Sequence, residues 1–279
     1  MPLNANHLGQ LTFEPTETVL TDRDAMLYAL SIGLGRDPMD EHDLRYTYEK
    51  DLRVFPTMPL IVGHPGLWTS DTRTGVTRNM VVHGAQKLIA YADLPIGRPL
   101  LTTNKISSVL DKGDKGALVV LSRRTYDKEH GLLLAQSESG VFCRADGGFS
   151  GAFGEPMEFT GIPERAPDMV IGTPTESSQA LLYRLNHDRN PLHVDPRAAK
   201  AAGFARPILH GLCTFGVAAA SIARAFPSRK IQSIEARFSK PVTPGECVTV
   251  ELWHQGGSLA FRARVDARVV LDHGSATLE

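Results

Sequence analysis

Alternation of apolar and polar residues with a period of two occurs in several segments of this chain, and that period is typical of half-buried strands. In the C-terminal part the alternating segments are 231–239, 246–255, 258–267 and 268–277. In the N-terminal part they are 101–110, 116–125 and 131–145. Turn-forming residues such as Gly256-Gly257 separate neighbouring segments, so each set predicts one antiparallel sheet.

One segment departs from this alternation because it is apolar or small almost throughout. Residues 212–223 predict a helix that is buried on nearly every side, and Gly211 stands at its start. The pair His210-Gly211 has an echo in the first half, His83-Gly84, so we expect a buried helix after that pair as well. Each half then consists of a long helix followed by an antiparallel sheet, which is the α+β class.

This weak repeat divides the chain into two domains, which we expect at 1–150 and 179–279. The residues between them, 151–178, are rich in Gly, Pro, Ser and Thr, which is typical of a linker. With 279 residues, the chain is long enough for two domains of ordinary size.

The two halves differ in the distance between matching residues. From Tyr28 to His83 there are 55 positions, whereas from Tyr183 to His210 there are 27, so the first half carries about 28 extra residues. They include 56–65, a mixture of prolines and apolar residues. An insertion of this length in a compact domain is usually functional or disordered.

Charge and cysteine content argue against several classes of protein. There are 30 basic and 31 acidic residues, a net charge of −1, so no basic excess points to nucleic acid as a partner. The three cysteines have no zinc-site spacing and are too few for a disulfide framework, which fits a reducing compartment. No signal peptide is evident and no stretch has the apolar length of a membrane span, so we expect a cytoplasmic protein without a membrane partner.

The candidate chemistry is concentrated in residues 183–195. Asp188, Asn190 and His193 lie within six positions, and Pro191 prevents them from sharing one regular helix. We therefore expect a tight turn that points a carboxylate, an amide and an imidazole into one small space. A carboxylate and an imidazole that share one water can act as a general acid and base. Taken singly, the aspartate and the asparagine are also common turn formers beside proline.

Two blocks of residues resemble the MaoC-like, type 2 or (R)-specific enoyl-CoA hydratases. The first block, 183–193, has the spacing of Tyr, Asp, Asn-Pro and His that marks the family's hydratase signature. The second block, 206–216, surrounds Gly211. The first block departs from the family at Asn186-His187, where Ser-Gly is usual, and this bears on the backbone just before the aspartate. An asparagine tolerates the left-handed conformation better than most residues.

The resemblance implies a fold of two tandem hot-dog domains, in each of which an antiparallel sheet wraps around a central helix. It also implies that only the second domain, 179–279, is catalytic, because the first lacks the Asp-x-Asn-Pro-x-His run. The first domain, 1–150, would be a degenerate hot-dog whose extra residues accommodate the acyl chain. His64 and His83 would then have structural rather than chemical roles.

The resemblance further implies reversible hydration of trans-2-enoyl-CoA to (3R)-3-hydroxyacyl-CoA, a hydro-lyase reaction. Asp188 and His193 would be the catalytic residues that activate the water. Asn190 would orient the water, and Gly211 N–H would stabilise the negative thioester oxygen. His210 would either contact the ligand or satisfy buried backbone groups at the helix start. An acyl-CoA thioester is the expected substrate, and neither a cofactor nor a metal is expected.

Alternatives stay open at this point. The same chemistry could dehydrate a 3-hydroxyacyl group on an acyl carrier protein in fatty-acid or polyketide synthesis, which a contiguous basic patch would favour. The chain could bind acyl thioesters without turning them over, although the intact Asp-x-Asn-Pro-x-His run argues against this. A thioesterase is disfavoured because 212–223 lacks the expected carboxylate. A homodimer is compatible with the resemblance, but the sequence does not fix the oligomeric state.

Overall fold

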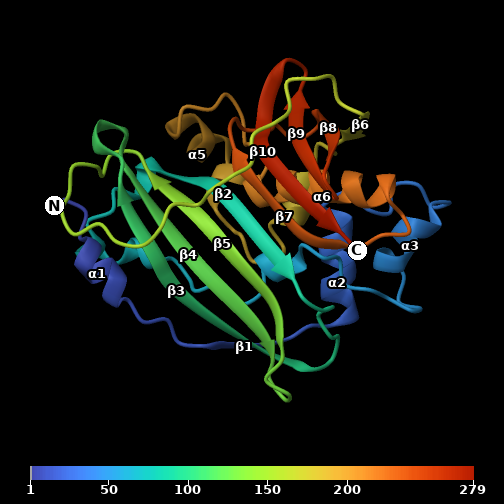
Figure 1. Ribbon diagram of the computed structural model, residues 1–279, viewed down its shortest axis with the longest axis horizontal. Coiled ribbons are helices and arrows are strands. Elements are labelled where there is room, and N and C mark those ends of the chain that lie inside the picture. Colours follow the sequence, from blue (N-terminus) through green and yellow to red (C-terminus); the bar gives the residue numbers. More distant parts are fainter. Residues whose placement is uncertain (1) are drawn as a thin grey trace.

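The computed structural model describes residues 2–279, whose ten strands form one continuous antiparallel sheet (Figure 1). The strands of the first half are β1 (Thr16–Val19), β2 (Val81–Ala90), β3 (Pro99–Asp111), β4 (Ala117–Asp127) and β5 (Leu133–Cys143). Those of the second half are β6 (Met169–Pro174), β7 (Ile231–Phe238), β8 (Cys247–Gln255), β9 (Ser258–Val265) and β10 (Arg268–Leu278). Their order across the sheet is β1-β3-β4-β5-β2-β7-β10-β9-β8-β6. All seven predicted alternating segments are confirmed as strands.

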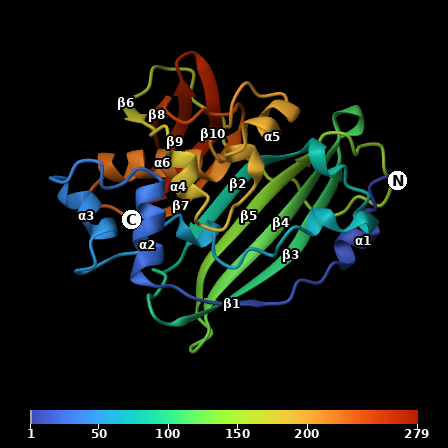
Figure 2. The ribbon, with the colours of Figure 1, turned by 180° about the vertical axis from the view of Figure 1, so that it is seen from behind.

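Helices lie mainly behind the sheet in the view of Figure 1 and in front of it in Figure 2. The α-helices are α1 (Ala5–Gln10), α2 (Asp22–Ser31), α3 (Glu41–Thr47), α4 (Gln179–Tyr183), α5 (Pro196–Ala201) and α6 (Gly211–Ala225). Single 3-10 turns are found at η1 (Met58–Leu60), η2 (Trp68–Ser70), η3 (Thr72–Thr74), η4 (Arg78–Met80), η5 (Gly113–Lys115) and η6 (Pro191–His193). None of the helices of residues 2–279 combines the length and the apolar character that crossing a bilayer requires.

The central helix of the second half is α6, which confirms the buried helix that was predicted over 212–223. Every residue from Cys213 to Ala223 is buried, because strands β6, β7 and β8 pack against the helix. Gly216 also lets the helix approach the first half closely, since a Cβ there would lie 2.4 Å from Cγ2 of Ile32. Burial of this apolar surface, at roughly 25 cal/mol per Å², is the main stabilising contribution in this half.

The helix that was expected after His83-Gly84 is not present, and that prediction was wrong. These residues lie in β2, which pairs with β5 on one side and with β7 on the other. Val81 and Val82 are β-branched and favour a strand, and a bulge at Gly84 shifts the register between His83 and Ala85. The two His-Gly pairs therefore resemble each other in sequence without being equivalent in structure.

The insertion of the first half occupies the place that a central helix would fill. Its residues Phe55, Met58, Leu60 and Val62 are buried in the same core as α6. Figure 2 shows this segment crossing in front of the first-half strands. The sheet binds it through polar side chains: a guanidinium N–H of Arg123 donates to Leu60 O at 2.7 Å, and Nδ2–H of Asn104 donates to Gly63 O at 3.0 Å.

The pairing of β2 with β7 joins the two halves into one sheet. Strands β2 and β7 pair from Ala85 with Arg237 to Ile89 with Ser233. Part of the predicted linker 151–178 forms β6, which pairs with β8 at the far edge. The linker also crosses the outer face of the first half, as Figure 1 shows, and Lys87 Nζ donates there to the carbonyl of Glu158.

Candidate active site

The loop between α4 and α5 brings the predicted acid/base residues together. The Asp188 Oδ1 atom accepts the backbone N–H of Asn190 at 3.2 Å, and the Asn190 Oδ1 atom accepts the N–H of Leu192 at 3.1 Å. These bonds fold the chain into η6, which turns His193 back toward the aspartate. One nitrogen of His193, one nitrogen of His210 and a carboxylate oxygen of Asp188 all lie within 4.8 Å of one another. That separation allows one water to bridge the carboxylate and an imidazole.

His193 is held in its neutral form. Its side chain is 9% exposed, and its Nδ1 lies 2.8 Å from the carbonyl oxygen of Ile208. Because a carbonyl only accepts, Nδ1 carries the proton, which leaves the Nε2 lone pair free. Burial lowers the pKa of His193, and this outweighs the opposing effects of the Ile208 carbonyl and the Asp188 charge. At neutral pH the imidazole can therefore accept a proton from water.

His210 fixes the backbone of the aspartate instead of capping the helix. Its Nε2–H donates to the carbonyl oxygen of Asp188 at 3.2 Å, while no side-chain hydrogen bond caps α6. The ring stacks on that of His193, with centroids 3.7 Å apart. Burial and the neighbouring imidazole lower the pKa of His210 to about 4. Its Nδ1 is buried and has no hydrogen-bond partner in residues 2–279, so it remains a free acceptor.

Gly211 is the first residue of α6, and its N–H precedes the helical hydrogen bonds. The helix dipole makes this end positive, so the amide can stabilise a developing negative charge. The position leaves little room for a side chain, because a Cβ there would lie 3.3 Å from Cε1 of Phe238. A glycine thus keeps the amide accessible beside the aromatic ring.

The family departure at Asn186-His187 has a clear structural outcome. His187, which stands where the family has glycine, adopts the left-handed conformation with a φ of 74°, whereas Asn186 is buried. This conformation costs a residue with a Cβ about 1–2 kcal/mol, and histidine is among the residue types that tolerate it best. The strained residue immediately precedes Asp188.

Two histidines of the first half lie within electrostatic range of Asp188, which the sequence did not indicate. The Asp188 charge acts to raise the pKa values of both His64 and His83, so all three groups are electrostatic neighbours. Burial has the larger effect and lowers the pKa of His83 to about 4. The His83 ring lies 4.5 Å from that of Phe238, the residue beside Gly211. Only the pairing of β2 with β7 brings His83 to this place, and no local motif encodes that pairing.

The three clustered groups could also hold a metal ion by their spacing. Each histidine uses one ring nitrogen on a backbone carbonyl, so one nitrogen of each ring and the Asp188 carboxylate are left for other partners. Two imidazoles and one carboxylate are a ligand set that zinc accepts. Water activation by a carboxylate and a neutral imidazole does not require such an ion.

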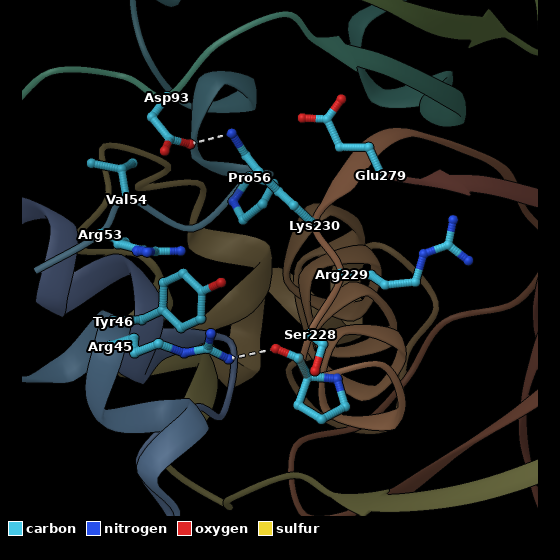
Figure 3. A pocket seen from close by; sticks show the side chains of 11 residues that line it. Arg45, Tyr46, Arg53, Val54, Pro56, Asp93, Ser228, Arg229, Lys230 and Glu279 are labelled. Carbon is cyan, nitrogen blue, oxygen red and sulfur yellow. Dashed lines mark hydrogen bonds and ion pairs between the residues drawn. The ribbon is translucent and has the colours of Figure 1, made fainter.

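A separate cavity of about 200 Å³ lies at the other end of α6 (Figure 3). Basic side chains from both halves line it, and two contacts cross the boundary between the halves there. Arg45 donates to the carbonyl oxygen of Pro227 at 3.0 Å, and Lys230 pairs with Asp93 at 2.5 Å. No residue of the 183–193 block lines this cavity, so the candidate chemistry does not lie there.

Comparison with known proteins confirms the family resemblance. Residues 19–145 match the MFE-2 hydratase 2 N-terminal domain, and residues 158–274 match the MaoC like domain. The 3-hydroxyacyl-thioester dehydratase Y of Mycobacterium tuberculosis is 39% identical, over 99% of this chain and 98% of that protein. The peroxisomal enoyl-CoA hydratase 2 of Arabidopsis thaliana is 34% identical, over 91% of this chain and 88% of that protein.

Solved structures agree with this assignment. A MaoC-like dehydratase from Phytophthora capsici has a TM-score of 0.86 and 31% identity, with 99% of both chains covered. A conserved hypothetical protein of Mycobacterium tuberculosis, described as having a double hotdog fold, has a TM-score of 0.57 at 18% identity, over 96% of this chain and 97% of that one. The predicted double hot-dog fold is thereby confirmed, with an irregular segment in place of the central helix in the first unit. The chain belongs to the MaoC-like dehydratase family, in the form that joins an MFE-2 hydratase 2 N-terminal domain to a MaoC-like domain.

Proposed function

We propose that the chain catalyses the reversible hydration of trans-2-enoyl-CoA to (3R)-3-hydroxyacyl-CoA. The observation that carries the proposal is that neutral His193, whose Nδ1 is bonded to Ile208 O, has a ring nitrogen within 4.8 Å of a carboxylate oxygen of Asp188. Named relatives that match this chain over most of its length include an enoyl-CoA hydratase and a 3-hydroxyacyl-thioester dehydratase, which are the two directions of one reaction.

The acid/base pair handles the water. Asp188 and His193 each accept one of its O–H groups, which orients an oxygen lone pair toward C3 of the enoyl thioester. As the O–C3 bond forms, the pair takes one proton from the water, and the electrons of the C2–C3 double bond move toward the thioester carbonyl. The pair then delivers a proton to C2. The water is consumed and the enzyme returns to its starting charge, so the scheme balances without a redox partner.

The enolate charge falls on the thioester oxygen, where Gly211 N–H receives it at the positive end of α6. A donor of this kind contributes roughly 10²–10³-fold in rate. Asn190 has its Oδ1 bonded to Leu192 N–H, and we assign its Nδ2–H to the water or to the Asp188 carboxylate. His210 supports the loop through the Asp188 carbonyl, and its Nδ1 remains a free acceptor.

The test is a direct assay of the purified protein. Loss of the enoyl absorbance is followed with crotonyl-CoA and with a long-chain trans-2-enoyl-CoA, and the product is identified by mass. We expect hydration of both CoA thioesters. Hydration of the same acyl group on an acyl carrier protein alone would favour the carrier-protein dehydratase instead. Tight binding of the thioester without turnover would favour a non-catalytic hot-dog protein.

A further inference from the structure

We propose that Ser31 of the first half is a positioning residue for the catalytic loop of the second half, and that it acts through Asn186. The juxtaposition that carries this inference is the hydrogen bond from Asn186 Nδ2–H to Ser31 Oγ, at 2.9 Å between residues 155 positions apart. The inference rests on the proposed hydration, and it gives the half that lacks the catalytic signature a direct part in the reaction rate.

Both partners of this contact are rigidly held. Ser31 is fully buried at the end of α2, and its hydroxyl donates to the carbonyl oxygen of Tyr28 at 2.7 Å, so its lone pairs face Asn186. Asn186 is 6% exposed, and its Nδ2 group also donates to the carbonyl oxygen of Tyr183 at 3.0 Å. The amide is thus shared between the end of α4 and the end of α2. A buried group that is satisfied on two sides has little freedom to move.

This contact lies next to the strained part of the loop. His187, directly after Asn186, is left-handed at a φ of 74°, and Asp188 follows it. On the other side of the strained residue, the Asp188 carbonyl accepts Nε2–H of His210. The loop is therefore fixed before and after His187, and strain of this kind persists only where the surroundings determine the conformation. The direction of the Asp188 carboxylate depends on that fixation.

We call the Ser31–Asn186 hydrogen bond the clamp. Asn186 and the strained His187 that follows it are the two residues at which this chain departs from the family signature. A glycine in place of His187 would adopt the left-handed conformation without strain. A serine in place of Asn186 would have no Nδ2 group to divide between Tyr183 and Ser31. The two departures are therefore coupled. His187 introduces backbone strain, and the hydrogen bond of Asn186 to Ser31 stabilises the loop in that strained conformation.

The experiment is a double-mutant cycle between Ser31→Ala and His187→Gly, with kcat and KM measured for a trans-2-enoyl-CoA. In the native background, Ser31→Ala should lower kcat roughly tenfold, which corresponds to about 1.4 kcal/mol. KM should change less than about twofold, because loss of a contact that acts on the transition state alone leaves ground-state binding intact. In the His187→Gly background, the same substitution should lower kcat by less than about threefold. Asn186→Ala, which leaves α2 intact, gives the same cycle if Ser31→Ala does not fold.

A matched control is Ser221→Ala, since Ser221 is also fully buried and its hydroxyl bonds to the carbonyl of Val217 within α6, away from the loop. It should lower the melting temperature and leave kcat unchanged. A readout independent of turnover is the NMR signal of the His210 Nε2 proton. This signal should exchange faster in Ser31→Ala, but not when His187→Gly is also present.

Native kcat in Ser31→Ala, with the His210 proton still protected, overturns the inference. An equal loss of kcat in both backgrounds also overturns it, because the loss would then follow stability rather than loop strain. If the native protein hydrates no enoyl-CoA, the proposed function fails, whereas the NMR cycle still decides whether the clamp exists.

Discussion

The two halves of the sheet are covered in different ways, and the difference explains why only one of them has a complete candidate site. In the second half, the strands pack against a continuous helix, α6, through apolar side chains such as Val250 and Phe261. In the first half, the irregular 55–64 segment lies on the sheet and is held by Arg123 and Asn104. A helix directs its free amides and its positive dipole end at one point, and an irregular segment does not. Within residues 2–279, only the second half therefore places the N-terminus of the helix that covers its sheet beside the candidate acid/base residues.

The cover of the first half carries an electrostatic cost that the second half avoids. Arg123 is 5% exposed and forms no ion pair with any carboxylate in residues 2–279, and burial lowers its pKa to about 10. Its hydrogen bonds to Leu60 O and to Asn104 Oδ1 partly offset the lost hydration. The apolar face beneath α6 needs no such compensation.

The largest expected effect is on kcat, which should depend on the acid/base pair of the second half far more than on the histidines of the first half. Asp188→Asn and His193→Ala should each lower kcat at least about a hundredfold with folding intact, because each removes one member of the acid/base pair. Replacing His64 by alanine should lower kcat much less. Asp195→Asn is the matched control, since Asp195 caps α5 in the same region and asparagine also caps well. Steady-state assays decide, and near-native turnover in either pair variant would remove that residue from the mechanism.

The glycines of the two His-Gly pairs, Gly211 and Gly84, should also differ in how strongly their substitution lowers kcat. Gly211→Ala places a methyl group 3.3 Å from Cε1 of Phe238, next to the amide proposed to bind the thioester oxygen. The kcat should therefore fall roughly tenfold or more, as for impaired oxyanion stabilisation. Gly84→Ala, whose added Cβ would lie 3.4 Å from Gly140 O, should change stability only modestly and leave kcat intact. Equal losses of kcat in both variants would show that the first half also holds a working site.

Substitution of Arg123 should change hydrogen exchange only in the segment that its side chain holds. Arg123→Met removes the donor to Leu60 O, so amides of 58–64 should exchange hydrogen roughly tenfold faster, as expected when a loop loses an anchor. The neighbouring exposed Arg124 is the control, and Arg124→Met should leave that exchange unchanged. Hydrogen-exchange mass spectrometry measures both variants. Unchanged protection in Arg123→Met would mean that the buried apolar residues alone hold the segment.

The smallest effect concerns acid stability. The pKa of His83 is lowered from 6.5 to about 4 in the folded protein, so the folded state favours the neutral ring. That stability is present above pH 6.5 and is lost as the pH falls through about 4, because the unfolded chain then binds the proton more readily. His83→Gln should make the free energy of unfolding depend less on pH between pH 4 and 6.5. It should retain most of kcat. An unchanged pH profile in urea unfolding would contradict the assigned burial.

Much of this architecture follows from local sequence. The period-two segments became β3–β5 and β7–β10 because alternation directly reports one buried face, and the apolar run became α6. The cluster of Asp188 and His193 was also predictable, since Pro191 and the short spacing force one tight turn. These features depend on neighbours within a few residues.

The remaining features depend on pairing across the chain. The 81–90 segment forms a strand because β5 and β7 provide hydrogen bonds on both sides, although its His-Gly pair resembles a helix start. The proximity of His83 to the site and the Ser31–Asn186 bond arise from the same joining of halves. Sequence spacing carries no direct signal of such contacts, because tertiary pairing overrides local preference.

In the proposed mechanism, Asp188 and His193 add water to one face of an enoyl thioester bound at Gly211. The most direct measurement is hydration of crotonyl-CoA by the purified protein, followed by chiral analysis of the 3-hydroxybutyryl product. We expect the (3R) product from the native protein and almost none from Asp188→Asn. Formation of the (3S) product, or undiminished (3R) product from the Asp188 variant, would contradict it.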